Sequence, residues 1–385
     1  MDDEFEEFES NLRKRRARVK RVILILFAAT VILFITILVI AGYNYTWTGF
    51  SSQPQPKTFW DWLQLLIVPT VLVLLTIWFN QQRQSADAEA TQEREKSARL
   101  IALDNKRETA LQTYLDRMTE LLISHKLRES SPDSEVRAVA RARTLTVLKD
   151  LDGERRATVL QFLKEAGLIE VDPVVNLAGA ILTKADLTKA KLAHSNLSQV
   201  DLTFAKLYRA DLRESDLRGV NLSFANLSQA HLERSDLTGA ELGATKLTDT
   251  WMEQAQLERA KLLEASLGEA KMRGANLKNV DANDANFNEA DLEDADLREA
   301  DLRRSNLSGA KLLKANLQRA LLDEVDLTLA DLTDADLSRA LMQDVKLDGA
   351  NLTRANLRQT GLMADRLIGT LSASGAIMHD GAIHG

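Results

Sequence analysis

The sequence predicts an elongated solenoid that follows two membrane-spanning helices and a helical connector. Three observations indicate this fold class: two apolar stretches near the N-terminus, a polar helix-favouring region after them, and a strict five-residue repeat through the second half of the 385 residues. The aromatic residues support this division, because 13 of the 20 lie in the first 80 positions. The repeat must therefore build its core almost without aromatic side chains.

Two apolar stretches predict a helical hairpin in a membrane. Residues 22–42 hold 21 positions without a charge, about the length that crosses a ~30 Å hydrocarbon layer as a helix. A secretory signal is the alternative, but its apolar region is shorter, ~7–15 residues. Residues 59–79 form a second stretch with tryptophans near both ends, as is common at membrane interfaces. The loop between them, 43–58, is too short to fold alone.

The distribution of cations predicts the orientation of this hairpin. Seven cations precede the first apolar stretch, whereas the loop holds only Lys57. Because Lys and Arg resist translocation, we expect both termini in the cytoplasm. Nucleic acid is a weaker explanation, since cations next to a span are accounted for by topology and anionic lipid. The topology determinants are Arg13, Lys14, Arg15, Arg16, Arg18, Lys20 and Arg21.

Residues 80–174 predict a helical connector. The stretch after Asn80 is polar and rich in helix formers, so it continues as a solvated stalk. Apolar residues then recur at helical spacing until the sequence SSPD at 130–133 breaks the pattern. A second helix is expected from Ser134, and a third from Gly153 to a stop at Gly167. The predicted segments of the whole chain are 1–21, 22–42, 43–58, 59–79, 80–174, 175–370 and 371–385.

A repeat of five residues fills the chain from 175 to 370. Stepping by five from Leu177 to Leu367 gives 39 positions, of which 34 are Leu. Such a period forms no stripe on an α-helix, and on a flat strand it sends alternate leucines to opposite faces. A chain that turns a corner every five residues and winds around its leucines remains, which is a solenoid. The expected inward ladder includes Leu177, Leu187, Leu197, Leu212, Phe287 and Leu332.

The repeat resembles the pentapeptide repeat family, whose pattern [Ala/Ser/Thr/Val]-[Asp/Asn]-[Leu/Phe]-x-x recurs in stretches such as ADLTDADLSRALMQDVKLDGANL. The resemblance implies a right-handed quadrilateral β-helix with four repeats per coil and about ten coils. In it the central Leu, and the small residue two before it, point inward. Two apolar stretches, a helical linker and these repeats are also similar to membrane-bound bacterial members, which implies a bacterial plasma (inner) membrane.

A coil of twenty residues would stack equivalent positions about 4.8 Å apart. The sequence agrees with this stacking, because charges alternate down such columns, as in Lys271, Asp291, Lys311 and Asp331. Phe204 would lie over Phe224. Ala282 leaves room in its coil that Phe287, one corner later, is expected to fill.

The residues needed for catalysis are missing from the pattern. The chain has no cysteine, no glycine-rich phosphate loop and no HExxH sequence. Carboxylates are numerous, but on a rod they point to solvent, where no buried pocket raises a pKa for acid catalysis. We therefore expect no enzyme, no cofactor, no metal site and no small-molecule substrate.

Outward apolar side chains predict a protein-binding side of the rod, because a solenoid needs none on its surface. The candidates are Phe204, Phe224, Trp251, Leu321 and Leu341. The alternative is that these are scattered surface residues, which are common. The expected partners are the lipid bilayer and an unknown cytoplasmic protein, and homo-oligomerisation is left open.

The sequence therefore favours a membrane-anchored scaffold over two other functions. Some soluble pentapeptide proteins imitate DNA and bind type II topoisomerases, but residues 176–367 hold 31 acids against 25 bases. Interleaved cations weaken the negative field that such mimicry needs. A sensor that acts through the loop 43–58 is the third hypothesis, and that loop carries no ligand signature.

Overall fold

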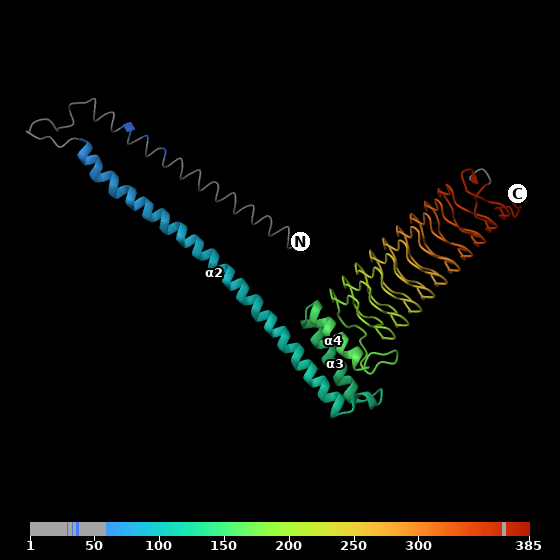
Figure 1. The fold of residues 1–385 in the computed structure, drawn as a ribbon, viewed down its shortest axis with the longest axis horizontal. Coiled ribbons are helices and arrows are strands. Elements are labelled where there is room, and N and C mark those ends of the chain that lie inside the picture. Colours follow the sequence, from blue (N-terminus) through green and yellow to red (C-terminus); the bar gives the residue numbers. More distant parts are fainter. Residues whose placement is uncertain (1–28, 30–32, 34–35, 38–58, 364–366) are drawn as a thin grey trace, which may run out of the picture. The chain divides into compact units, whose positions relative to one another are not determined.

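The computed structural model describes residues 59–363 and 367–385, together with residues 29, 33, 36 and 37 (Figure 1). The chain divides into two compact units, Met1–Arg99 and Leu100–Gly385. The first expected span, 22–42, lies outside the described residues apart from those four positions. The seven basic residues before it lie outside them entirely.

Helix α2 covers Phe59–Ile123, a length of 65 residues. The stretch expected as the second span, 59–79, and the polar stalk after it thus form one continuous helix. Among the residues that the structure describes, none of the helices combines the length and the apolar character needed to cross a membrane. The structure therefore does not confirm the second span.

The second unit begins with three packed helices, which are the end of α2, α3 (Glu135–Asp150) and α4 (Gly153–Glu165). A short 3-10 helix, η2 (Leu127–Glu129), lies in the connection between α2 and α3. Ser134 and Asp152 are the N-caps of α3 and α4, and their side-chain oxygens accept backbone hydrogen bonds from Arg137 and Arg155. The core between the helices includes Leu111, Met118, Leu148, Leu160 and Leu163, all buried.

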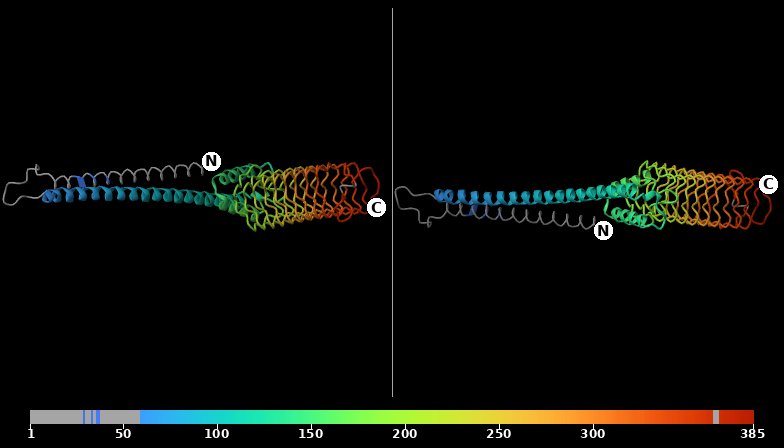
Figure 2. Two further views of the ribbon diagram at one scale, coloured as in Figure 1. Left: turned by 90° about the horizontal axis from the view of Figure 1, so that it is seen from above. Right: turned by 90° about the horizontal axis from the view of Figure 1, so that it is seen from below.

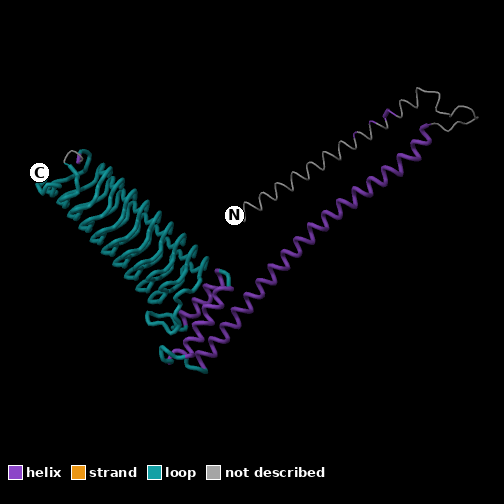
Figure 3. The backbone as a smooth tube through the Cα atoms, turned by 180° about the vertical axis from the view of Figure 1, so that it is seen from behind, coloured by secondary structure: helices purple, strands orange, loops and turns teal. Residues whose placement is uncertain are grey.

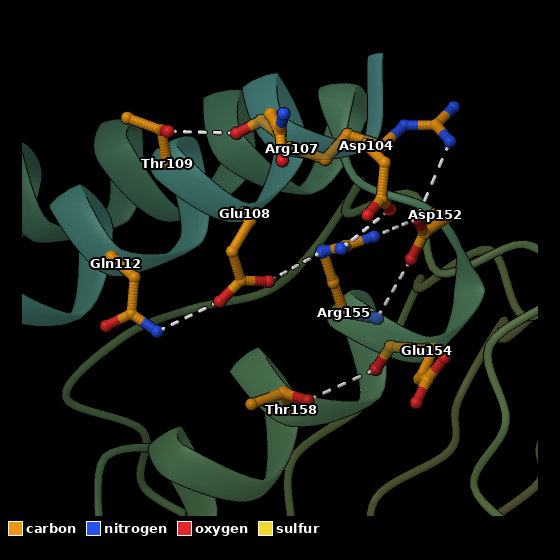
Figure 4. Close-up of polar contacts among 10 residues, drawn as sticks. Asp104, Arg107, Glu108, Thr109, Gln112, Asp152, Glu154, Arg155 and Thr158 are labelled. Carbon is orange, nitrogen blue, oxygen red and sulfur yellow. Dashed lines mark hydrogen bonds and ion pairs between the residues drawn. The ribbon is translucent and has the colours of Figure 1, made fainter. Parts of the chain in front are cut away.

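Two polar contacts fix α2 against the shorter helices. The Tyr114 hydroxyl lies 2.9 Å from Thr144 Oγ1 inside the bundle, and burial raises the pKa of Tyr114. At the surface, the Arg155 guanidinium of α4 donates to Asp104 and Glu108 of α2 and to Asp152, at 2.8, 3.0 and 2.6 Å (Figure 4). The orientation of the bundle is thus set by both packing and charge.

The rest of the unit is a rod of stacked coils (Figures 2 and 3). Parallel bridges join residues twenty apart along almost its entire length, from Ile181↔Asp201 to Asp336↔Asn356. Two backbone N–H groups in each repeat donate to the following coil, as Leu182 does to Asp201 O at 2.8 Å. Each coil therefore presents four repeats, and residues at equivalent positions in successive coils form columns along the rod.

Every repeat turns in the same way. The residue three after the central Leu donates to its carbonyl, as Ala185 N does to Leu182 O at 3.1 Å. The residue between, at every fifth position from Gly179 to Gln359, has a positive φ of about 50–80°. This is the third residue of a type II turn, which favours Gly or Asn. Most of these positions nevertheless carry other residues, each at a cost of roughly 1–2 kcal/mol.

Where the residue before the central position is Asp or Asn, its side chain stabilises the turn that follows. Asp201 Oδ1 accepts a hydrogen bond from Thr203 N at 3.0 Å, and Asn221 Oδ1 accepts one from Ser223 N at 3.1 Å. Short side chains that bind the backbone two residues on are the ones that make such local turns. This local hydrogen bond explains why Asp and Asn are frequent at the second position of the repeat.

The core of the rod consists of the central residues and the small residues two before them. Its largest fully buried side chain is Phe287, and Ala282 is equally buried. From Leu177 to Leu357 the central positions are at most 3 % exposed, with the exceptions of Met342 and Leu347. The interior is therefore a continuous leucine ladder with one aromatic step.

The last coil departs from the five-residue phase. Ser372 pairs with Asn351 and Ile377 with Asn356, a separation of 21 residues instead of twenty. The next buried central residue after Leu367 is Ala373, six positions on. One extra residue therefore enters near 370, and the segment after it continues the ladder. It ends in an antiparallel bridge from Ile377 to Ile383.

The helices cover the first coil of the rod, whose carbonyls have no preceding coil. Arg141 donates to the carbonyls of Asn176 and Ala178 at 3.1 and 2.9 Å. Arg156 donates to Thr183 O at 2.6 Å, and Lys164 donates to Ala193 O at 2.6 Å. These donors satisfy groups that would otherwise attract another strand.

Candidate protein-binding surface of the rod

No group of three or more His, Asp or Glu side chains among the described residues could hold a metal ion. The ladder residues named from the sequence are all buried, at 0–3 % exposure, and thus cannot contact a partner. They are Leu177, Leu187, Leu197, Leu212, Phe287 and Leu332. On the rod, contact with a partner must then come from the outward columns.

Phe204 and Phe224 form an exposed aromatic pair. Their rings stack with centroids 5.0 Å apart and planes inclined by 11°. Both side chains are about half exposed, at 52 % and 57 %. Both backbones are left-handed, with φ of 59° and 60°. Two aromatic residues therefore occupy positions that disfavour them twice, through the backbone and through exposure.

Leu321 and Leu341 lie on the same side as this pair. An unbroken series of parallel bridges runs from Asp201 through the coils to Leu321 and Leu341, and the phenylalanines stand at the corner that follows that column. Leu341 is 54 % exposed, but Leu321 is only partly exposed. Leu321 therefore presents less surface than Leu341, with which it pairs in the next coil, and both remain candidates.

Trp251 belongs to a different column. Its ring lies 5.3 Å from that of His231, and Lys271 Nζ stands 3.6 Å from its centroid on the other side. Its exposure is 38 %, since both neighbours cover it. Trp251 is therefore an exposed residue that presents less of its surface than Phe224 does.

Charged side chains on the rod are largely paired. Within a coil, Arg218 donates to both carboxylate oxygens of Asp216, at 2.9 and 2.6 Å. Between coils, Lys261 binds Glu241 at 2.7 Å and Arg354 binds Asp334 at 2.6 Å. The hydrogen bonds from Arg218 lower the pKa of Asp216. Opposite charges therefore neutralise each other at these positions, both within a coil and between coils.

Two arrangements of side chains in the structure were not predicted from the sequence. One is the column His231, Trp251 and Lys271, which a search at a spacing of twenty residues would have shown. The other is a polar groove near the C-terminal end, whose lining includes five cations from successive coils. They are Lys278, Arg298, Arg319, Arg339 and Arg358. The same spacing of about twenty reveals them.

Comparisons with known proteins agree with the repeat. A model described as pentapeptide repeats matches residues 180–219, 215–250 and 320–359, and a second model, pentapeptide repeat region, matches residues 250–327. No curated protein sequence matches the chain. Solved structures do match.

The crystal structure of HetL is 36 % identical in sequence, with 55 % of this chain and 90 % of HetL covered and a TM-score of 0.47. HetL is a pentapeptide repeat protein involved in heterocyst differentiation regulation, from the cyanobacterium Nostoc sp. strain PCC 7120. Rfr23, a pentapeptide repeat protein from the cyanobacterium Cyanothece 51142, is 32 % identical in sequence. The match covers 31 % of this chain and 62 % of Rfr23, at a TM-score of 0.17.

A more distant match is QnrB1, a plasmid-mediated fluoroquinolone resistance protein. It is 16 % identical, with 46 % of this chain and 87 % of QnrB1 covered, at a TM-score of 0.29. The stronger evidence for the family comes from the two family models, which match within residues 180–359, and from the 36 % sequence identity to HetL over 90 % of its length. On these grounds the chain belongs to the pentapeptide repeat family, whose members form right-handed quadrilateral β-helices.

Proposed function

We propose that the chain is a non-enzymatic scaffold that presents its β-helix to a protein partner. The observation that carries this proposal is the stacked pair Phe204 and Phe224, exposed at 52 % and 57 % on a left-handed backbone. Exposed aromatic residues are common in protein interfaces. Leu341, six coils further along the rod, is a second exposed apolar residue on the same side.

The test is proximity labelling from the full chain in living cells. Changing both Phe204 and Phe224 to Ser should remove specific neighbours from the labelled set. Leu329→Ser is the matched control, because Leu329 occupies the same turn position with φ of 60° and is 70 % exposed, but on another corner. An identical set of neighbours for the phenylalanine variant and the wild type would contradict the choice of surface.

The proposal includes a membrane anchor in a bacterial plasma membrane. Its support is the 21-residue uncharged stretch 22–42, the apolar stretch 59–79 and the seven cations before the first. Both termini and the rod would then lie in the cytoplasm. The absence of cysteine makes this testable, since single cysteines can be introduced at will.

An impermeant maleimide applied to intact cells should label Ser51→Cys in the loop and leave Ser308→Cys in the rod unlabelled. Detergent lysis should then expose both to the reagent. Labelling of Ser308→Cys before lysis would show the opposite orientation. Recovery of the chain in the soluble fraction would overturn the anchor itself.

A topoisomerase-binding DNA mimic is the second candidate, favoured by the acidic stretch Asp281–Asp301. Here the structure offers a counter-argument, because Arg304 binds Asp284 at 2.7 Å and Arg273 binds Asp291 at 3.0 Å. The candidate requires the purified chain to inhibit gyrase supercoiling, and requires acid-to-amide changes in this stretch to abolish the inhibition. A transmembrane sensor acting through 43–58 is a third possibility, on residues outside those described.

A further inference from the structure

One column of the rod stacks two aromatic rings and a cation, followed in the next coil by a carboxylate that Arg273 binds. In successive coils it presents the aromatic rings of His231 and Trp251, then the ammonium of Lys271, then the carboxylate of Asp291. The rings are 5.3 Å apart, and Lys271 Nζ lies 3.6 Å from the Trp251 centroid. The spacing of the coils thus suits a cation placed directly on an aromatic ring.

The column of the phenylalanine pair has the same order with one member missing. Phe204 and Phe224 are followed by Ala244 and then by Glu264 in successive coils. The backbone hydrogen bonds that join these coils run from Phe224 N to Gly243 O at 3.0 Å and from Ala244 N to Leu263 O at 2.8 Å. Where the first column has Lys271, this one has only a methyl group.

The Phe224 ring and the Glu264 carboxylate, which lie in the coils on either side of Ala244, have no cation bound to them among the described residues. Within the described part of the chain, no cation lies over the ring of Phe224, and Phe204 stacks on only one of its faces. Glu264 is exposed, and its carboxylate forms no ion pair or side-chain hydrogen bond with another described residue. The next carboxylate, that of Asp284, is already held by Arg304.

We propose that a partner protein completes this column with an arginine side chain placed over Ala244, between the Phe224 ring and the Glu264 carboxylate. The inference rests on the proposed function, since it names the group that the docking surface recognises. Arginine suits the position better than lysine because its planar guanidinium stacks flat on a ring while its edge donates to a carboxylate.

Each contact is expected to be modest and the two to act together. A cation on an exposed ring contributes about 0.5–1 kcal/mol, and an exposed ion pair up to about 1 kcal/mol. The Ala244 methyl is small enough to leave the ring accessible. Arginine itself is tolerated at this turn position, because Arg304 in the same column and Arg234 at another corner adopt a left-handed φ of 57°. The column can therefore also be completed within the chain.

The binding test uses the full chain labelled with fluorophenylalanine and observed by fluorine NMR. The Phe204 and Phe224 signals are assigned by their loss in Phe204→Leu and Phe224→Leu. Acetyl-arginine amide should shift the Phe224 signal more than the Phe204 signal, whereas the neutral isostere acetyl-citrulline amide should shift neither. E264Q should weaken the arginine response by about two- to fivefold, the loss of one exposed ion pair. Equal responses to the two amides would overturn the proposal.

Two substitutions at one position provide the second test. Ala244→Arg should supply the missing cation, so the Phe224 signal should move without ligand and its response to acetyl-arginine amide should disappear. E264Q introduced into that variant should partly reverse the movement. Ala244→Ser is the control, because its small side chain leaves the Phe224 ring accessible and the response to acetyl-arginine amide should be retained. An Ala244→Arg variant that still responds like the wild type would contradict the proposal.

These outcomes separate the inference from the function on which it rests. If the phenylalanine variant loses labelled neighbours in cells but acetyl-arginine amide and acetyl-citrulline amide act alike, the scaffold stands and the arginine fails. If arginine amide binds selectively while the neighbours are unchanged, the column is a guanidinium site and the docking surface fails. Selective binding together with loss of those neighbours in Ala244→Arg supports both.

Discussion

Gly153 lies against the first coil of the rod so closely that a Cβ on it would stand 2.0 Å from the carbonyl oxygen of Lys184. Its own carbonyl accepts a hydrogen bond from Asp186 N at 3.3 Å. Gly153 is also the first residue of α4. The backbone of the helix and the backbone of the rod thus meet directly, and no side chain separates them.

Gly153→Ala is therefore expected to destabilise the junction between the helices and the rod. The neighbour is backbone and cannot rotate away, so the cost is that of overpacking, about 1–3 kcal/mol. Gly243→Ala is the control, because the nearest atom to its Cβ would be Leu263 O at an ordinary 3.8 Å. Chemical denaturation of both variants measures the difference. Equal midpoints for the two would show that the helix moves away at no cost.

Phe287→Ala should be the most damaging single truncation in the rod. Phe287 is the largest of the fully buried side chains, at 0 % exposure. Its loss would leave a cavity in a coil where Ala282 already provides little volume, and Phe→Ala in cores costs about 3–5 kcal/mol. Phe224→Ala, at 57 % exposure, is the control and should cost far less. Thermal melts compare the two, and similar losses would place the Phe287 ring outside the critical packing.

The central ladder could be predicted from the sequence because each coil repeats a local rule. One apolar residue in five and one small residue two before it are enough to identify what lies inside. Phe287 is an example, since its position alone places it in the core. The extra residue near 370 could not be predicted, because Leu367 keeps the old phase and the change appears only in the pairing of Ser372 with Asn351.

The sequence pattern also gives no indication of contacts between elements that are distant along the chain. Arg156 belongs to an ordinary polar helical pattern, yet its guanidinium binds Thr183 O of the rod at 2.6 Å. The candidate surface was only partly predictable for the same reason. Outward apolar residues can be found by phase, but how much of Leu321 and of Trp251 remains exposed depends on neighbours twenty residues away.

Gly239→Val should report the cost of the left-handed turn without a steric clash. Gly239 has φ of 66°, and a Cβ there would meet nothing within 4 Å. Valine is branched and disfavours this conformation, so a loss of roughly 1–2 kcal/mol is expected. Gly239→Asn should cost much less, since asparagine tolerates positive φ. Equal stabilities of the two variants in urea would mean that the turn relaxes to another conformation.

Acid should weaken the rod through carboxylates such as Asp216. The two hydrogen bonds from Arg218 lower its pKa in the folded state, whereas an unfolded aspartate titrates near ~3.9. As the pH falls below about 4, the unfolded chain therefore takes up the proton first, and unfolding becomes easier. The stabilisation is complete at neutral pH and disappears once the pH passes below the folded pKa.

Asp216→Asn removes this linkage while keeping the side-chain shape. The variant should be less stable than the wild type at pH 7, and the difference should shrink as the pH is lowered from 5 towards 2. Asp348→Asn serves as the control, since Asp348 forms no ion pair with another residue of the described chain. Urea midpoints measured across this range decide the matter. A constant difference between wild type and Asp216→Asn would mean that the carboxylate contributes through shape and hydrogen bonding alone, independently of its charge.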